Sequence, residues 1–399
     1  MRAYSAANEE AVCARDFLKD WRGAELVSAS QHQRMEPETA CELRRTNIFL
    51  RLVLLLFTLI IVGAAVGLFF VSAHIQDEQT AGIFLLFFAG LSYAAAEIAV
   101  SQHRLYRYGI EEALAVCSVG FLCAGIDLAF FKGALYSPGS HPAEFLVFAA
   151  GAAASLWIWR RFGLFYAFLA AMLFAAALPG YWTGSPSAQH LVLAAFYGTG
   201  LVAVAALRPG DRFTYLNSEY SIAEALLWLG VYLAINLQLS PENLRGIWSS
   251  GDVAGFPKPF YWTTWALIWC LPPIVLARGL RGKDRLVMAA GTVTAILTLV
   301  TNKPYLGWER HTWDPMLLGA LLIAVALLVR RWLAQAPGGV RHGFTAQRLS
   351  GKDKNWMSLG ASSLGFVAPG VVAPNPPPGT TGVKFGGGDS GGGGASSDF

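Results

Sequence analysis

Long apolar runs dominate the chain between residues 48 and 333. Ten of them hold about 16 to 24 residues each, close to the ~20 residues that an α-helix needs to cross ~30 Å of hydrocarbon. The pattern therefore predicts an all-α polytopic membrane protein with about ten transmembrane helices. The predicted spans are residues 48–71, 80–100, 109–131, 143–159, 162–178, 190–207, 221–239, 260–277, 286–301 and 315–333.

The fourth and fifth spans are divided only by Arg160 and Arg161. A single straight helix over this 36-residue stretch would be ~54 Å long, well beyond the thickness of a bilayer. We therefore expect two short helices or a hairpin here, and whether both cross the bilayer fully stays open.

Residues 1–46 have a different pattern, which predicts a small helical module outside the lipid. Residues 9–21 place apolar side chains, among them Val12, Phe17, Leu18 and Trp21, on one broad helical face. Ser28 or Ser30 can cap a second helix before Pro37 begins a turn. Because two short helices have little core of their own, we expect the module to dock on the membrane or on another chain.

Residues 334–399 lose the apolar periodicity and become rich first in proline and then in glycine and serine. Such a composition buries too little apolar surface to offset the entropy of ordering, so it predicts a disordered Gly/Pro-rich C-terminal tail. A solubilising tail is the plain interpretation. The alternative is a tail that binds a protein partner through the isolated Phe385 and Phe399.

Composition and charge support lipid as the main partner of residues 47–333, the transmembrane domain. The chain is 54% hydrophobic and only 14% charged, with a net charge of +4. Its basic residues flank apolar segments instead of forming one basic face, which argues against nucleic acid as a partner. One alternate set of connections holds ten Lys and Arg residues and the other holds five, so both termini are predicted to be cytoplasmic.

The ends of the predicted helices supply a first candidate site, a cytoplasmic rim. Arginines there can give bidentate donors to an anionic lipid headgroup or solute, with carboxylates setting their orientation. The alternative is a salt-bridged rim that fixes helix packing and topology. The candidate rim residues are Glu97, His103, Arg104, Arg107, Glu111, Glu112, Arg208 and Glu224, joined by Asp211, Arg212 and Glu219 near the facing ends of the sixth and seventh spans.

A second candidate lies on the outer face, where His311 and Asp314 stand three residues apart. They can share one face of a helical turn, as a base with its orienting carboxylate or as two metal ligands. No HExxH or Walker sequence occurs, so no catalytic residue, metal or cofactor is assigned. A solvated interfacial loop is the alternative.

Two further features bear on assembly. Gly63 and Gly67 form a GxxxG pattern that allows close helix approach within the protein or in a homo-oligomer. The five cysteines are widely spaced and without a CxxC pair, so we expect thiols instead of disulfides or a zinc site.

The segment FLKDWRGAELVSASQHQRM, residues 17–35, resembles the N-terminal segment of bacterial predicted membrane proteins grouped as domain of unknown function 2157. The polar turn with Glu97 and Arg104 is similar to one that follows the second helix in that family. The resemblance covers about the first third of the chain. It implies a short helical segment before a multi-helix membrane region and brings no known activity. The matching positions are Leu18, Trp21, Leu26, Ser28 and Gln31.

We hypothesise a bacterial inner-membrane protein with a non-enzymatic role in binding, sensing or assembly, whose N-terminal module and tail recruit protein partners. Two alternatives stay open. One is a transporter of a small solute or lipid that uses the cytoplasmic rim. The other is a membrane enzyme that acts on a lipid-linked substrate at the outer face.

The predicted orientation can be tested with topology reporters. A reporter that works only in the cytoplasm should be active when it is fused after Leu333. A reporter that works only outside should be active when it is inserted into residues 240–259. The reason is that connections rich in basic residues stay in the cytoplasm. A C-terminal reporter active outside would contradict the orientation.

Overall fold

The computed structural model of the protein describes residues 2–23, 26–131, 141–208, 214–239, 256–308, 311–335, 340–341 and 344–345. Within these residues, nine helices are long and apolar enough to cross a membrane. They are α3 (Ile48–Ser72), α4 (Glu78–Ser101), α5 (Ile110–Phe131), α6 (His141–Phe162), α7 (Phe165–Ala177) with α8 (Pro179–Trp182), α9 (Pro186–Leu207), α11 (Lys258–Gly282), α12 (Arg285–Tyr305) and α13 (Asp314–Ala334).

A further helix, α10 (Thr214–Ile235), stands at the seventh predicted span. Every predicted span therefore coincides with a helix, and the prediction of an all-α multi-pass membrane protein is confirmed. The 36-residue apolar stretch is indeed two helices: α6 ends at Phe162, and Gly163 adopts a left-handed φ of +69° before α7 begins. Glycine tolerates this φ because it has no Cβ.

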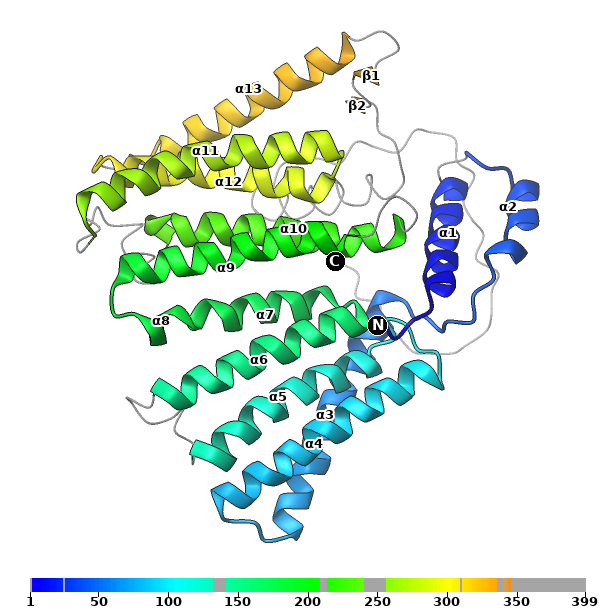
Figure 1. Ribbon diagram of the computed structural model, residues 1–399. Helices are drawn as coiled ribbons and strands as arrows, with labels where there is room; N and C mark the ends of the chain where they lie inside the picture. Colours follow the sequence, from blue (N-terminus) through cyan, green and yellow to red (C-terminus); the bar gives the residue numbers. More distant parts are fainter. Residues whose placement is uncertain are drawn as a thin grey trace, which may run out of the picture. The chain divides into compact units, whose positions relative to one another are not determined.

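Helices that are neighbours in sequence pack as antiparallel pairs: α4 with α5, α6 with α7, α9 with α10, and α11 with α12. Contacts of α5 with α6, of α7 with α9 and α10, and of α10 with α12 join the pairs, so the helices lie side by side nearly in chain order (Figure 1). Much of the remaining helix surface is exposed and apolar, as expected where lipid is the solvent. The extreme case is α13, none of whose residues is buried against other described parts of the chain.

Glycines set the closest helix contacts. A Cβ at Gly82 of α4 would collide with the backbone of Ala129 in α5, and a Cβ at Gly279 of α11 would meet Met288 of α12 at 2.8 Å. In contrast, the GxxxG residues Gly63 and Gly67 of α3 have no described atom within 4 Å of a built Cβ. The small-residue contacts that hold this bundle together are therefore in other helices.

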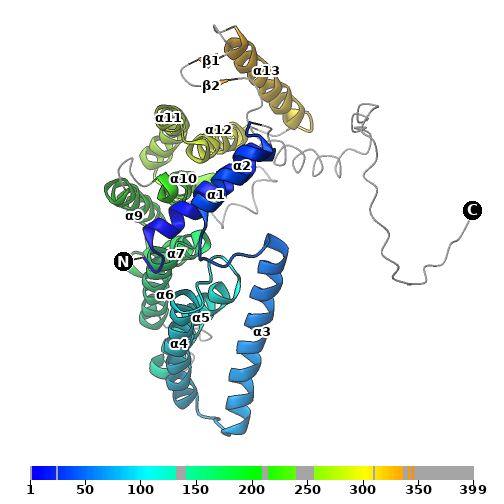
Figure 2. The ribbon, with the colours of Figure 1, turned by 90° about the vertical axis from the view of Figure 1, so that its right-hand side faces the viewer.

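The N-terminal helical module consists of α1 (Ala6–Gly23), α2 (Ala29–Met35) and the short 3-10 helix η1 (Pro37–Thr39). Ser28 caps α2 as predicted, in a capping box with Gln31. α1 contacts α10 and lies across the ends of the spanning helices (Figures 1 and 2). The predicted apolar face of α1 divides in two, because Val12 and Leu18 are buried whereas Phe17 and Trp21 are exposed.

After α13, strands β1 (Val340–Arg341) and β2 (Phe344–Thr345) pair antiparallel. They fall inside the tail that was predicted to be disordered. The rest of that tail, residues 336–339, 342–343 and 346–399, lies outside the described residues. So do residues 240–255 of the predicted outer connection and the predicted rim residues Asp211 and Arg212.

Gly82→Ala should strongly destabilise the protein, because the added methyl group forces α4 away from the α5 backbone. Overpacking of this kind costs ~1–3 kcal/mol or more. The matched control is Gly90→Ala on the same helix, where nothing lies within 4 Å of the new Cβ. Thermal unfolding in detergent should show a lower midpoint for Gly82→Ala only, and equal midpoints would contradict the packing.

Candidate functional site

The predicted cytoplasmic rim divides into several separate sets of polar contacts. One long-range link joins its two predicted halves: Arg107 Nη2 donates to Glu219 Oε1 at 3.2 Å, from the α4–α5 connection to α10. Arg208 and Glu224 are joined to each other, with Nη1 donating to Oε2 at 3.0 Å. The other rim residues have partners elsewhere or are exposed.

The first set ties the N-terminal module to the spanning helices. Arg2 donates from Nη1 to Glu9 Oε1 at 2.8 Å, and its Nη2 pairs with Glu219 Oε2. Arg107 completes the group through Glu219. We call Arg2, Glu9, Arg107 and Glu219 the N-terminal cluster. Ala3 adds a backbone bond to the carbonyl oxygen of Arg161 at 2.9 Å, so the segment before α1 is held by main chain as well as by charge.

A tight turn presents Arg107 to this cluster. Arg104 and Arg107 both adopt positive φ, +54° and +51°, in the left-handed region. The backbone N–H of Tyr106 donates to the carbonyl oxygen of Arg44 at 3.0 Å, and that of Arg44 to Arg104 at 2.9 Å. The α4–α5 connection is therefore pinned to the strand-like segment that leads from the module into α3.

Glu9 is the most unusual group of the N-terminal cluster. Its side chain is only 4% exposed, and its Oε2 has no hydrogen-bond partner among the described residues. Burial raises the pKa of Glu9 from 4.5 to about 7, although the nearby Arg2 acts in the opposite direction. A carboxyl group so placed changes its protonation near neutral pH.

A cavity of about 110 Å³ adjoins the cluster. That volume holds several water molecules. It opens between α1, the segment before α3, the α4–α5 connection and α10. Its lining consists of Glu9, Val12, Cys13, Asp16, Arg45, Tyr106, Arg107 and Glu219.

Glu97, on α4, is held by Arg161 at the end of α6. The guanidinium donates from Nε at 2.6 Å and from Nη2 at 2.9 Å, a bidentate pair. Tyr93 also donates its hydroxyl to Glu97 at 2.8 Å, and Trp157 donates to that hydroxyl at 2.9 Å. The carboxylate is thus engaged on both oxygens and joins α4 to α6.

Glu111 and Glu112 open α5, and both are about 1% exposed. Glu112 accepts a hydrogen bond from Arg51 Nε of α3 at 2.9 Å and pairs with its Nη2 as well. Glu111 accepts from the backbone N–H of Tyr108 at 2.7 Å, at the start of its own helix. Gly109, directly before α5, has a φ of +105° and lets the backbone of α3 come close, because a Cβ at this position would strike the carbonyl oxygen of Arg51.

Arg104 and His103 stand apart from these buried groups. Arg104 pairs with Glu42, but both side chains are more than half exposed. His103 is exposed on the surface. Neither residue lies in the N-terminal cluster, although Arg104 is close to it in sequence.

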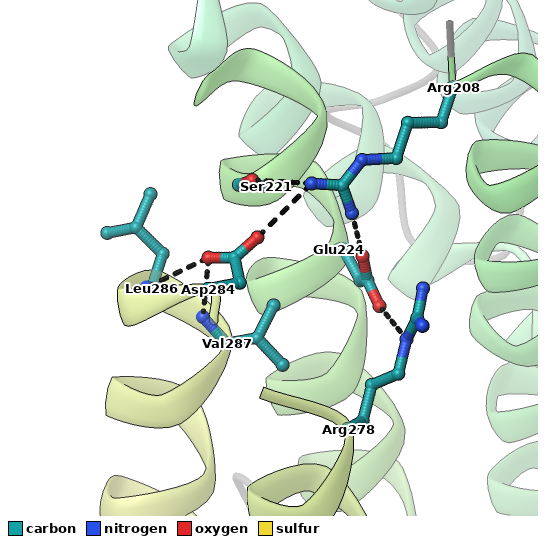
Figure 3. Close-up of polar contacts among 7 residues, drawn as sticks. All are labelled: Arg208, Ser221, Glu224, Arg278, Asp284, Leu286 and Val287. Atoms are coloured by element: carbon teal, nitrogen blue, oxygen red, sulfur yellow. Dashed lines mark hydrogen bonds and ion pairs between the residues drawn. The ribbon is translucent and has the colours of Figure 1, made fainter. Parts of the chain in front are cut away.

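A second set of contacts, centred on the buried Glu224 and shown in Figure 3, joins four helices. Glu224 of α10 accepts from Arg208 at the end of α9 and from Arg278 Nε of α11 at 2.9 Å. Arg208 also reaches Ser221 Oγ at 3.2 Å and Asp284 Oδ2 at 3.5 Å. Asp284 in turn caps α12 by accepting from the backbone N–H groups of Leu286 and Val287 (Figure 3).

On the other side of the bundle, His311 and Asp314 do not pair through their side chains. Asp314 accepts from the backbone N–H of His311 at 3.0 Å and from Lys303 Nζ at 2.6 Å. The imidazole of His311 stacks on Trp313, with ring centroids 5.6 Å apart. These contacts order the turn before α13 and leave the imidazole without an orienting carboxylate from Asp314.

A buried polar seam between α10 and α12 was not predicted from the sequence. Asn236 donates to Tyr232 and to Thr301, both at 3.0 Å, and Tyr232 bonds Thr298 at 2.9 Å. The backbone N–H of Leu237 donates to Tyr305 at 2.8 Å. The only sequence signal was the helical spacing of threonines on α12, which is easily taken for ordinary surface.

The chemical capacity of these sets is therefore limited. The buried carboxylates of the rim mostly have arginine or backbone donors, which suits helix packing better than capture of a loose anion. Across the part of the chain that the structure describes, no three His, Cys, Asp or Glu side chains are grouped to hold a metal ion.

Comparison with protein-family models, with curated proteins and with solved structures finds no match to this chain. The resemblance to domain of unknown function 2157 therefore stays a prediction from the N-terminal residues.

Glu224→Ala should destabilise the protein by ~1.5–3 kcal/mol, because it removes the charge-assisted hydrogen bonds to Arg208 and Arg278, whose side chains are themselves 26% and 48% exposed. Glu42→Ala is the matched control, since it breaks an exposed pair worth only ~0–1 kcal/mol. Chemical unfolding in detergent would measure both. A Glu224 variant as stable as the Glu42 variant would refute the structural role of the set.

Proposed function

We propose that the chain is a non-enzymatic component of a bacterial inner membrane that binds a protein partner through its N-terminal helical module, with both termini cytoplasmic. The membrane-spanning helices act as the platform, and the module is the part that partners recognise. The role is one of assembly or sensing.

The observation that carries this proposal is an exposed aromatic pair on α1. The rings of Phe17 and Trp21 lie 6.3 Å apart, and the side chains are 53% and 45% exposed. α1 is not among the helices that are long and apolar enough to cross a membrane, so a membrane-spanning position does not account for these exposed rings. Exposed aromatics are enriched where proteins bind one another.

The attachment of the module adds support. Arg2, Glu9 and the buried Glu219 hold the start of α1 against α10, while the side chains of Phe17 and Trp21 stay exposed. Arg45 and Asp16 add a contact at 2.9 Å between α1 and the segment before α3. A module fixed at one end presents its aromatic pair in a defined orientation, which lowers the entropy cost of binding.

The alternatives have less support. A transporter with an anion site at the rim needs arginines available to the solute, whereas Arg161, Arg208 and Arg278 already pair with carboxylates. An outer-face enzyme needs an oriented base, whereas His311 stacks on Trp313.

Native mass spectrometry of the full chain, released gently from its own membrane, tests the proposal. We expect a bound protein mass in the wild type that is lost in Phe17→Ala/Trp21→Ala, because the partner loses its aromatic contact. The control is Arg15→Ala, an exposed residue of the same helix, which should retain the partner. A bare wild-type protein would contradict the proposal, and a retained lipid or solute instead of a protein would favour the rim site.

A further inference from the structure

We propose that Glu9 is a proton-binding switch for the N-terminal module: its protonated form holds α1 on the spanning helices, and its ionised form loosens α1. The use of such a switch rests on the proposed function, since loosening would change how the module meets a partner. The docking itself does not depend on any partner.

Two carboxylates, Glu9 and Glu219, share one guanidinium, so ionising both is costly, and a proton-dependent switch needs such a cost. Glu9 and Glu219 both contact the same guanidinium, that of Arg2, through its two terminal nitrogens. Glu219 has a second cation, Arg107, whereas Glu9 has only one of its oxygens paired. Ionised Glu9 therefore stands buried beside another carboxylate with one charged donor and an unpartnered oxygen, which is costly.

Among the other charged groups around Glu9, Arg107 favours the ionised form, but its hydrogen bond goes to Glu219. On α1, Asp16 engages Arg45. Tyr106 of the α4–α5 connection is covered by the guanidinium groups of Arg45 and Arg107 on its ring. The groups that face Glu9 or line the adjoining cavity are Arg2 and Tyr4 from the N-terminal segment, Cys13 and Asp16 from α1, Arg45, Tyr106, Arg107 and Glu219.

Water has a route to this group, since Glu9 is part of the wall of the 110 Å³ cavity. Protons can therefore exchange at Glu9 without unfolding of the membrane helices. Undocking of α1 would expose Glu9 to solvent and restore its ordinary acidity.

The direction of the pH dependence of docking follows from the difference in the pKa of Glu9 between the docked and undocked states. The pKa of Glu9 is about 7 in the docked state, against an ordinary value of 4.5 when exposed. Docking is thus strongest at pH values below 4.5, weakens as the pH rises toward 7, and is weakest above it. Between about pH 5 and about pH 8 the docking constant should fall by roughly 50- to 100-fold.

Hydrogen exchange of α1 in the full chain, held in lipid nanodiscs, measures docking directly. After correction for intrinsic exchange rates, wild-type protection of α1 should fall by about the same factor between the two pH values. Glu9→Gln, which is neutral at both, should stay protected at both. Glu10→Gln, an exposed neighbour on the same helix, should behave as wild type.

Glu219→Gln serves as the reference for undocking, because it removes the carboxylate shared by Arg2 and Arg107 and should lower α1 protection at both pH values. Protection of α12 reports that each variant is folded. Wild-type protection that does not change with pH, or a Glu9→Gln variant that keeps the wild-type pH dependence or is unprotected throughout, would overturn the switch. Loss of partner binding with normal pH-dependent docking would instead count only against the proposed function.

Discussion

A carboxylate buried at a helix end needs a cationic or backbone donor, and this need fixes how the helix ends of this protein fit together. Glu112 binds Arg51, Glu224 lies between Arg208 and Arg278, and the partly exposed Glu97 binds Arg161 in the same way. Arg161, Arg51 and Arg278 each reach a helix outside their own antiparallel pair, whereas Arg208 holds α9 to its partner α10. Apolar packing alone would permit such helices to slide or rotate, whereas a directional hydrogen bond between an arginine and a carboxylate permits few arrangements.

The helices were predictable because their signals are local. Apolar runs of bilayer length predicted the positions of the long helices, and Ser28 predicted the start of α2, where it forms a capping box with Gln31. The contacts of the rim were not predictable in the same way. Arg2 and Glu219 are 217 residues apart, and nothing near either residue indicates the other. Sequence reasoning placed the charges at the correct helix ends but could not say which arginine each carboxylate would bind.

The aromatic face of α1 illustrates a different limit. Helical periodicity grouped Val12, Phe17, Leu18 and Trp21 on one broad face, yet only Val12 and Leu18 are buried. The reason is that the start of α1 is fixed by Arg2 and Glu9, so the helix is set by its charges and only part of its apolar face meets the bundle. A pattern of hydrophobicity describes a helix in isolation and does not include such constraints.

The two ends of α10 are held by different chemistry. At its start, Glu219 and Glu224 bind arginines, and at its end Asn236 and Tyr232 bond threonines of α12. Hydroxyl and amide groups keep their charge state across physiological pH, so the seam should be indifferent to protons and to salt. Ionic contacts respond to both, and more strongly where solvent reaches them. A change of pH or salt on the side of the N-terminal module should therefore act on the ionic contacts at the start of α10. The hydroxyl and amide contacts at its end should meanwhile keep α10 and α12 in register.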